Sequence, residues 1–133
     1  MKLMLDTDTC IFIIRRNPPE IVERFKQYVV GDIGISSITA AELYLGAAKS
    51  RHPDKNLNAL EEFFLPLEIA PFDQRAAFVY GPLRAHLEKA GTPAGSLDTL
   101  IGAHALSLGT TLVTGNVREF SRIPDLSLTN WLV

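Results

Sequence analysis

Residues 2–6 of the chain read KLMLD, a run of three apolar residues that ends at an acidic one. A short, continuous apolar run is typical of a buried strand in a parallel sheet. The chain turns polar directly after it, at Asp6, Thr7 and Asp8. Because a carboxylate at the end of a buried strand loses hydration free energy unless it is paired, Asp6 is a candidate functional residue.

Short apolar runs and helical patterns alternate along the rest of the chain. We predict further strands at residues 33–36, 67–70, 111–114 and 126–128, and helices at 9–16, 23–28, 39–50, 57–64, 73–89, 96–108 and 117–120. Gly81 and Pro82 should kink or split the helix that contains them. The alternation predicts an α/β fold in which helices cover both faces of a parallel sheet.

Composition indicates the size and setting of the protein. The chain has 133 residues, of which 47% are hydrophobic, and it shows no repeat or low-complexity tract, so we expect a single domain over residues 1–133. The three apolar residues between Lys2 and Asp6 are too few for a signal peptide. No later stretch approaches the roughly 20 apolar residues of a membrane span, and we therefore expect a cytoplasmic protein.

The net charge of −2 argues against a protein that coats nucleic acid nonspecifically, because such proteins carry a large basic excess. It does not exclude a nuclease, which can gather its acidic residues in one pocket and its basic residues around it. The single cysteine, Cys10, has apolar neighbours that predict a buried thiol. No histidine shows metal-ligand spacing, and His104 is expected to be a hydrogen-bonded core residue.

Acidic and amide side chains occur where predicted strands end and helices begin. Asp6 ends the first strand, and Asn116 follows the fourth. Glu42 and Asp98 fall in the first turns of two predicted helices. Because strand ends and helix starts meet at one edge of a parallel sheet, we expect these four side chains to share one crevice.

Three carboxylates in one crevice repel one another, and two that lie ~4 Å apart do so by about 4 kcal/mol at an effective dielectric constant of about 20. Either one group keeps its proton or a divalent cation occupies the crevice. Ligands that are all oxygen suit Mg²⁺ or Mn²⁺, whereas zinc favours His or Cys. We therefore favour a site for Mg²⁺ or Mn²⁺.

Two of these residues also have a structural interpretation. Thr39 and Glu42 have the spacing of a capping box, in which the glutamate would bond the backbone of the cap residue. Asp98 lies two residues after Ser96, the predicted cap, and could simply complement the positive end of its helix. The joint placement of all the acidic residues at one sheet edge favours a shared site.

Four segments together resemble the PIN-domain ribonucleases and, among them, the VapC toxins. The segments are residues 4–12 (MLDTDTCIF), 35–46 (ISSITAAELYLG), 95–103 (GSLDTLIGA) and 112–120 (LVTGNVREF). Each motif is weak alone, but the four occur in the family's order and span nearly the whole chain. The resemblance implies a PIN-like three-layer α/β/α fold with a short parallel sheet of about five strands.

The resemblance also implies roles for single residues. Asp6, Glu42 and Asp98 correspond to the metal ligands of the family. Asn116 stands where many relatives have a fourth acidic residue, so it would ligate weakly or orient a water or phosphate, and Glu119 would supply the missing charge. Asp8 replaces the Asn that is usual in the similar toxins, and this extra carboxylate would alter metal affinity or mark a weakened enzyme.

The implied activity is metal-dependent cleavage of structured RNA at single-stranded loops, above all the tRNA anticodon loop, which would inhibit translation. The products would be a 5′-phosphate and a 3′-hydroxyl. The resemblance also implies a homodimer and a VapB-type antitoxin that obstructs the acidic pocket. The toxin would contact operator DNA only through this antitoxin. The basic residues that we consider candidates for RNA contacts are Arg15, Arg16, Lys49, Arg51 and Arg118.

Two alternative functions remain open at this stage. Asp6 and Asp8 also fit the D-x-D signature of haloacid-dehalogenase-type phosphatases, as nucleophile and acid/base. That family, however, prefers Thr or Val at the position of Cys10 and an acidic pair where this chain has residues 114–116. The second alternative is a PIN module without catalysis that acts with an antitoxin in DNA-bound regulation, and Asp8 and Asn116 motivate it.

Overall fold

A computed structural model describes residues 1–132 of the chain. Its strands form one sheet in the order β3-β2-β1-β4-β5, and every neighbouring pair is parallel. The predicted parallel sheet is therefore confirmed, with β1 at its centre. The strands are β1 (Leu3–Leu5), β2 (Ile33–Ser36), β3 (Glu68–Ala70), β4 (Thr111–Val113) and β5 (Leu128–Thr129).

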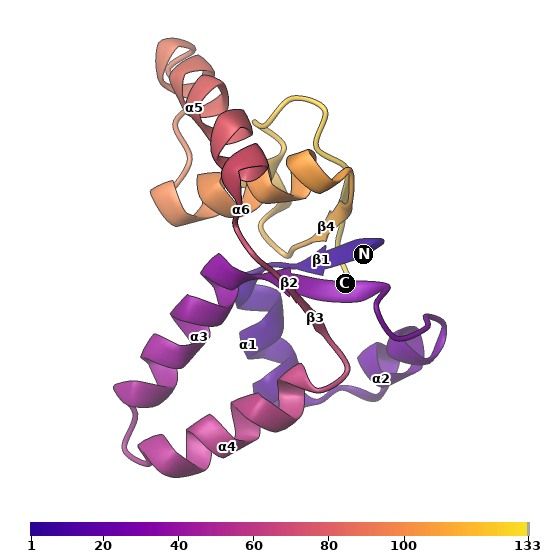
Figure 1. The fold of residues 1–133 in the computed structure, drawn as a ribbon. Helices are drawn as coiled ribbons and strands as arrows, with labels where there is room; N and C mark the ends of the chain where they lie inside the picture. Colours follow the sequence, from indigo (N-terminus) through magenta and orange to yellow (C-terminus); the bar gives the residue numbers. More distant parts are fainter. Residues whose placement is uncertain (133) are drawn as a thin grey trace.

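Helices cover both faces of this sheet (Figure 1). The first four helices pack on one face, and α5, α6 and α7 pack on the other. No helix within residues 1–132 has the length and apolar content needed to cross a membrane. The helices are α1 (Thr7–Arg16), α2 (Pro19–Lys26), α3 (Ser37–Ala48), α4 (Pro53–Phe64), α5 (Gln74–Lys89), α6 (Ser96–Leu108) and α7 (Val117–Phe120).

Two hydrophobic cores result, one on each face of the sheet. Leu3 and Leu5 point into the core beneath the first four helices, whereas Met4 points into the core beneath α5 and α6. This alternation follows from the two-residue period of a strand. Each buried side chain of this size contributes about 1.5–3 kcal/mol, which explains why the whole strand is apolar. Asp6 follows it at the middle of the sheet edge.

Helices α1 to α4 begin earlier than predicted, and α6 is capped by a different residue. Helix α1 begins at Thr7 because the side chain of Asp6 caps it. Helix α3 begins at Ser37, since the hydroxyl of Ser36 accepts the backbone N–H of Ile38 at 3.0 Å. The residue that caps α6 is Gly95, which has no side chain to do so. The predictions of caps at Thr39 and Ser96 were therefore wrong.

Of the kink or split predicted at Gly81 and Pro82, a split is wrong, because α5 runs through both residues as one helix. Pro82 is exposed, and so is Phe78, whose backbone carbonyl group Pro82 leaves without its helical donor. Leu83 and Leu87, on another side of the helix, are buried in the second core. Packing on one side therefore holds the helix together while the proline is tolerated on the other.

Candidate active site

Asp6 is 3% exposed and already has a structural role at the end of β1. Its Oδ1 accepts the backbone N–H of Thr9 at 2.8 Å, which caps α1. Its own backbone N–H donates to the carbonyl group of Val113 at 3.0 Å, so the ends of β1 and β4 are joined here. Burial raises the pKa of Asp6, hydrogen bonds from Thr114 and Thr9 oppose the rise, and the charge of Asp8 adds to it.

Glu42 lies in the second turn of α3 rather than in the first, and it forms no capping box because the helix begins at Ser37. Its Oε1 accepts the hydroxyl of Thr7 at 2.7 Å. The same hydroxyl lies 3.2 Å from that of Thr39. Thr7, the residue next to Asp6, therefore holds Glu42 from across the crevice. The sequence did not lead us to predict this contact, although a hydroxyl group beside Asp6 was a signal for it.

Asp98 lies within reach of the charges of the other carboxylates. Its side chain lies in the first turn of α6 and is half-buried. Burial raises its pKa, and the negative charges of four other carboxylates raise it further, to about 6; in decreasing order these are Glu119, Asp6, Asp8 and Glu42. The structure thus brings together the acidic residues that were predicted from four separate segments.

Asn116 and Glu119, at the start of α7, lie on one side of the acidic cluster. One carboxylate oxygen of Glu119 accepts the backbone N–H of Gly95 at 2.6 Å, and the other accepts the side-chain amide of Asn116 at 2.7 Å. A Cβ atom on Gly95 would lie 3.4 Å from that first oxygen and 3.7 Å from Oδ2 of Asp98. Glu119 therefore supports the start of the helix that carries Asp98.

The atoms of this cluster that could bind a metal ion are all oxygen, which fits a hard divalent cation. Cys10 lies near Asp6, but burial and the charge of Asp6 raise the pKa of its thiol well above the ordinary value. Cys10 is therefore a protonated, buried thiol, as predicted. His104 is also a hydrogen-bonded core residue, as predicted, with Nδ1 at 2.8 Å from the hydroxyl of Ser36.

The carboxylates are close enough to interact but are not closed around a point. Among residues 1–132 no three His, Cys, Asp or Glu side chains form a ready-made metal site. Glu42 is turned toward Thr7, and Glu119 toward Gly95 and Asn116. The charge that raises the pKa of Asp98 is nevertheless charge that a cation would offset, so the residues fit such an ion.

The five basic candidates are all exposed, and none pairs with an acidic side chain within residues 1–132. Arg118, in α7, is adjacent to Glu119 in the acidic cluster. The other four lie at or beyond the C-terminal ends of α1 and α3, whose N-terminal halves carry the carboxylates. At ~1.5 Å per residue they stand roughly 10–15 Å from the cluster, within the span of a few nucleotides.

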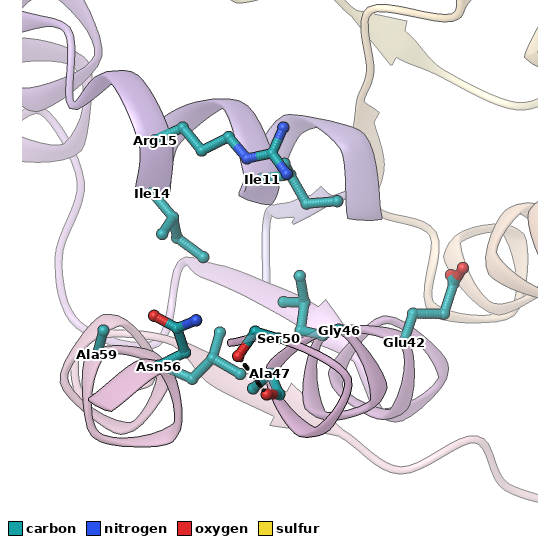
Figure 2. A pocket seen from close by; sticks show the side chains of 11 residues that line it. Ile11, Ile14, Arg15, Glu42, Gly46, Ala47, Ser50, Asn56 and Ala59 are labelled. Carbon is teal, nitrogen blue, oxygen red and sulfur yellow. Dashed lines mark hydrogen bonds between the residues drawn. The ribbon is translucent and has the colours of Figure 1, made fainter. Parts of the chain in front are cut away.

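A groove with a volume of about 290 Å³ begins beside Glu42 and runs between α1, α3 and α4 (Figure 2). Its walls are mainly apolar and include Ile11, Ile14 and Leu60. Figure 2 shows Glu42 at one end, with its carboxylate directed away from these walls. Three helices build the groove, which explains why no single sequence segment predicted it.

An open parallel sheet with acidic side chains gathered at the carboxyl ends of its central strands is the arrangement of a nuclease family. The chain belongs to the PIN-domain family, and the family model matches residues 3–126. Within this family it is similar to VapC proteins. It is 46% identical over 131 residues to the tRNA(fMet)-specific endonuclease VapC of Salmonella typhimurium, covering 98% of each chain. It is 43% identical to Ribonuclease VapC2 of Haemophilus influenzae, covering 99% of each.

Solved structures of VapBC complexes show the same fold. The DNA-bound VapBC of Salmonella typhimurium matches with a TM-score of 0.95 over 98% of both chains. VapBC2 of Rickettsia felis, bound to a fragment of promoter DNA, matches with a TM-score of 0.94 at 40% identity, over 98% of this chain and 99% of that one. The predicted PIN-like three-layer α/β/α fold is thus confirmed, and the comparisons favour a ribonuclease over a haloacid-dehalogenase-type phosphatase.

Proposed function

We propose that this chain is the toxin of a toxin–antitoxin pair and acts as an endoribonuclease that depends on a divalent metal. The observation that carries the proposal is the gathering of carboxylates around Asp98, where burial and the charges of these carboxylates raise its pKa to about 6. Gathering like charges opposes folding, so such a cluster indicates a site whose charge is offset in use. The similarity to VapC ribonucleases supports the class of reaction.

Asp6, Glu42 and Asp98 would hold a Mg²⁺ or Mn²⁺ ion. When bound, the ion supplies an activated water and offsets negative charge on the phosphodiester as it is attacked. Asn116 would use its free amide oxygen to orient a water or a phosphate, because its amide nitrogen already donates to Glu119. Glu119 would add charge beside Asp98 and hold Asn116 in place.

The surrounding residues orient the carboxylates before a substrate arrives. The Thr9 amide holds Asp6, and the Thr7 hydroxyl holds Glu42. Acceptors that are already oriented lose less freedom when a ligand binds. Asp8 lies exposed in the first turn of α1, and its negative charge raises the pKa of both Asp6 and Asp98. We propose that this extra charge tunes the affinity for the cation.

The proposed substrate is structured RNA with a single-stranded loop. The Salmonella typhimurium relative is named for tRNA(fMet), which supports tRNA and its anticodon loop as the target, and cleavage there would inhibit translation. A loop suits an acidic crevice because its unpaired backbone can bend into it. The exposed basic residues would contact the phosphates on either side of the cut; these are Arg15, Arg16, Lys49, Arg51 and Arg118.

The proposed partner is a VapB-type antitoxin that lies in the groove between α1, α3 and α4 and covers Glu42 (Figure 2). Two of the similar solved structures are VapBC complexes bound to DNA, which supports a partner of this type and DNA contact through it. We further propose that residues 1–133 act as one PIN domain, that the toxin is a homodimer, and that it works in the cytoplasm.

The test is to incubate purified, antitoxin-free protein with total RNA and with tRNA(fMet), in Mg²⁺ or Mn²⁺, and to map new 5′ ends. We expect cuts confined to loops, abolished by EDTA and by Asp6→Ala. The matched control is Glu61→Gln, which neutralises an exposed carboxylate of α4 outside the cluster and should leave cleavage unchanged. Cleavage that persists in EDTA and in Asp6→Ala would contradict the metal-nuclease proposal. The absence of cleavage at any metal concentration would favour a non-catalytic module.

A further inference from the structure

A buried polar contact joins the helix that carries Asp98 to the helix that carries Glu42. His104 of α6 is 1% exposed, and Ser36, the cap residue of α3, is fully buried. The two side chains meet with His104 Nδ1 2.8 Å from Ser36 Oγ. Within residues 1–132, no hydrogen bond joins either side chain to a carboxylate of the acidic cluster.

The hydrogen-bond directions in this contact can be assigned. Ser36 Oγ already accepts the backbone N–H of Ile38 at 3.0 Å. Its own proton needs an acceptor because the group is buried, and within the described chain Nδ1 of His104 is the atom that offers one. His104 therefore accepts at Nδ1 and carries its proton on Nε2. Burial lowers the pKa of His104, which agrees with a neutral ring, although the charge of Asp73 and a hydrogen bond to the Pro71 backbone oppose the shift.

The segment between β3 and α5 completes the contact. The ring of Phe72 packs edge-on against that of His104, with centroids 5.3 Å apart at 76°. The backbone N–H of Phe72 donates to the hydroxyl of Ser37 at 2.9 Å. The start of α3, the middle of α6 and residue 72 are thus joined through two adjacent serines. We call this set of contacts the histidine brace (Ser36, Ser37, Phe72 and His104).

We propose that His104 and Ser36 are positioning residues, which set the distance between Asp98 and Glu42 by joining the two helices that carry them. This inference rests on the proposed metal-nuclease function. Asp98 and His104 both belong to α6. Glu42 belongs to α3, and Ser36 is the cap residue of that helix. An apolar contact tolerates sliding, whereas a buried hydrogen bond with one donor and one acceptor specifies a single arrangement. The neighbouring core positions of α6, Ile101, Ala103 and Ala105, are apolar, so burial alone did not require a histidine.

The first experiment measures the brace in the unaltered protein. Two-dimensional ¹⁵N–¹H spectra of the imidazole rings report which nitrogen is protonated. We expect His104 to be neutral and protonated on Nε2, and the solvent-exposed rings of His52 and His86 serve as internal references in the same spectra. A proton on Nδ1, or a charged ring at neutral pH, would overturn the assignment and with it the brace.

The second experiment separates positioning from general stability. His104→Leu and Ser36→Ala each remove the hydrogen bond, whereas Leu87→Ala weakens the packing of α5 in the same core without touching it. We measure Mn²⁺ affinity by calorimetry, together with kcat and KM for RNA cleavage. Both brace variants should bind Mn²⁺ about tenfold more weakly, and their kcat should fall by a larger factor than their KM changes. The double variant should bind Mn²⁺ no more weakly than either single variant. Leu87→Ala should lower the unfolding temperature but keep wild-type Mn²⁺ affinity.

Conservative variants keep the test decisive if His104→Leu fails to fold. Ser36→Thr retains the hydroxyl, and His104→Asn places an amide near the position of Nδ1, so both should restore most of the Mn²⁺ affinity. Brace variants that match Leu87→Ala in Mn²⁺ affinity, or single effects that simply add in the double variant, would overturn the inference. If the wild-type protein itself bound no Mn²⁺ and cut no RNA, the proposed function would fail instead, and the ring spectra would still test the contact.

Discussion

The two halves of the acidic cluster are built differently. In the held half, Asp6 and Glu42 each accept a hydrogen bond from the start of α1, at 2.8 Å from the Thr9 amide and 2.7 Å from the Thr7 hydroxyl. In the open half, Asp98 has around it the charges of other carboxylates, and every one of them raises its pKa. The fold therefore orients the first half by itself, whereas the second half is where a cation would relieve the most repulsion.

This contrast separates two tasks that identical chemical groups perform. Asp6 is an acceptor that helps the chain fold, because it caps α1 while it faces the crevice. Asp98 opposes folding when its charge is not offset, because it is half-buried among like charges. Substitutions that remove a hydrogen bond in the held half should therefore lower activity and stability together, and substitutions in the open half should move them in opposite directions.

The largest effect is expected at Asp6. Asp6→Asn keeps an acceptor for the Thr9 amide but removes the charge, so cleavage should fall by about 10²–10³-fold with little change in the unfolding temperature. Asp6→Ala should lose the same activity and also about 1 kcal/mol of stability, since the cap is gone. Cleavage kinetics and thermal unfolding of both variants give the comparison. An active Asp6→Asn would show that the charge of Asp6 is not required.

The next effect is a gain of stability at Asp98. Its pKa in the folded protein, about 6, lies above the ordinary value of 3.8, so folding favours the protonated form. In the metal-free protein this carboxylate is therefore destabilising at neutral pH, and the penalty shrinks as the pH falls through about 6 toward about 4. Asp98→Asn should unfold at a higher temperature than the wild type in EDTA at neutral pH, and the two should converge near pH ~4. A variant that is less stable at neutral pH would contradict this reading of the open half.

The same titration should govern metal binding. Below a pH of about 6 a proton competes for Asp98, so Mn²⁺ affinity should fall as the pH is lowered, by up to about tenfold per unit. Calorimetric titrations at several pH values measure this directly. Binding that is constant down to pH ~5 would place the ion away from Asp98.

A smaller effect is expected at Thr7. Thr7→Val keeps the shape of the side chain but removes the donor to Glu42, so Glu42 loses its orientation. Cleavage should fall by about tenfold, at a cost in stability of about 1 kcal/mol. Thr7→Ser serves as the control because it keeps the hydroxyl and should retain most of the activity. Equal losses in the two variants would mean that the methyl group, and not the hydrogen bond, is what matters.

The smallest effect is expected from Asn116→Asp. In the metal-free protein the new carboxylate would face Glu119, whose oxygen lies 2.7 Å from the amide nitrogen that it replaces, so stability should fall slightly. The added charge should tighten Mn²⁺ binding by about two- to fivefold in calorimetry. Unchanged affinity would mean that residue 116 lies outside the reach of the ion.

The fold was predictable because its signals are local. Leu3, Met4 and Leu5 point alternately into the two cores, and a short apolar run is enough to predict such a strand. Strand β2 and helix α7 have the predicted bounds. The helix starts were less predictable, because Asp6, Thr7, Thr9, Ser36, Ser37 and Thr39 are all suitable cap residues in type. Which of them caps depends on where the strand before it ends.

The site was predictable in its location but not in its contacts. Parallel topology alone places Asp6, Glu42, Asp98 and Asn116 at one sheet edge. The hydroxyl of Thr7 on Glu42 and the carboxylate of Glu119 on Gly95 join residues that are far apart in the chain. No periodicity encodes such pairs, since they depend on how helices from different segments pack.

By itself, the sequence determined that strands and helices would alternate, that β1 would be buried on both faces, and that carboxylates would follow the strands, because each depends on residue type and spacing along a few residues. Only the tertiary structure decided that Asp6 would be held by hydrogen bonds while Asp98 would stand among like charges. It likewise placed His104 against Ser36. The physical reason is that desolvation and Coulomb repulsion act through space, so the tasks of identical carboxylates are set by neighbours that the chain order does not specify.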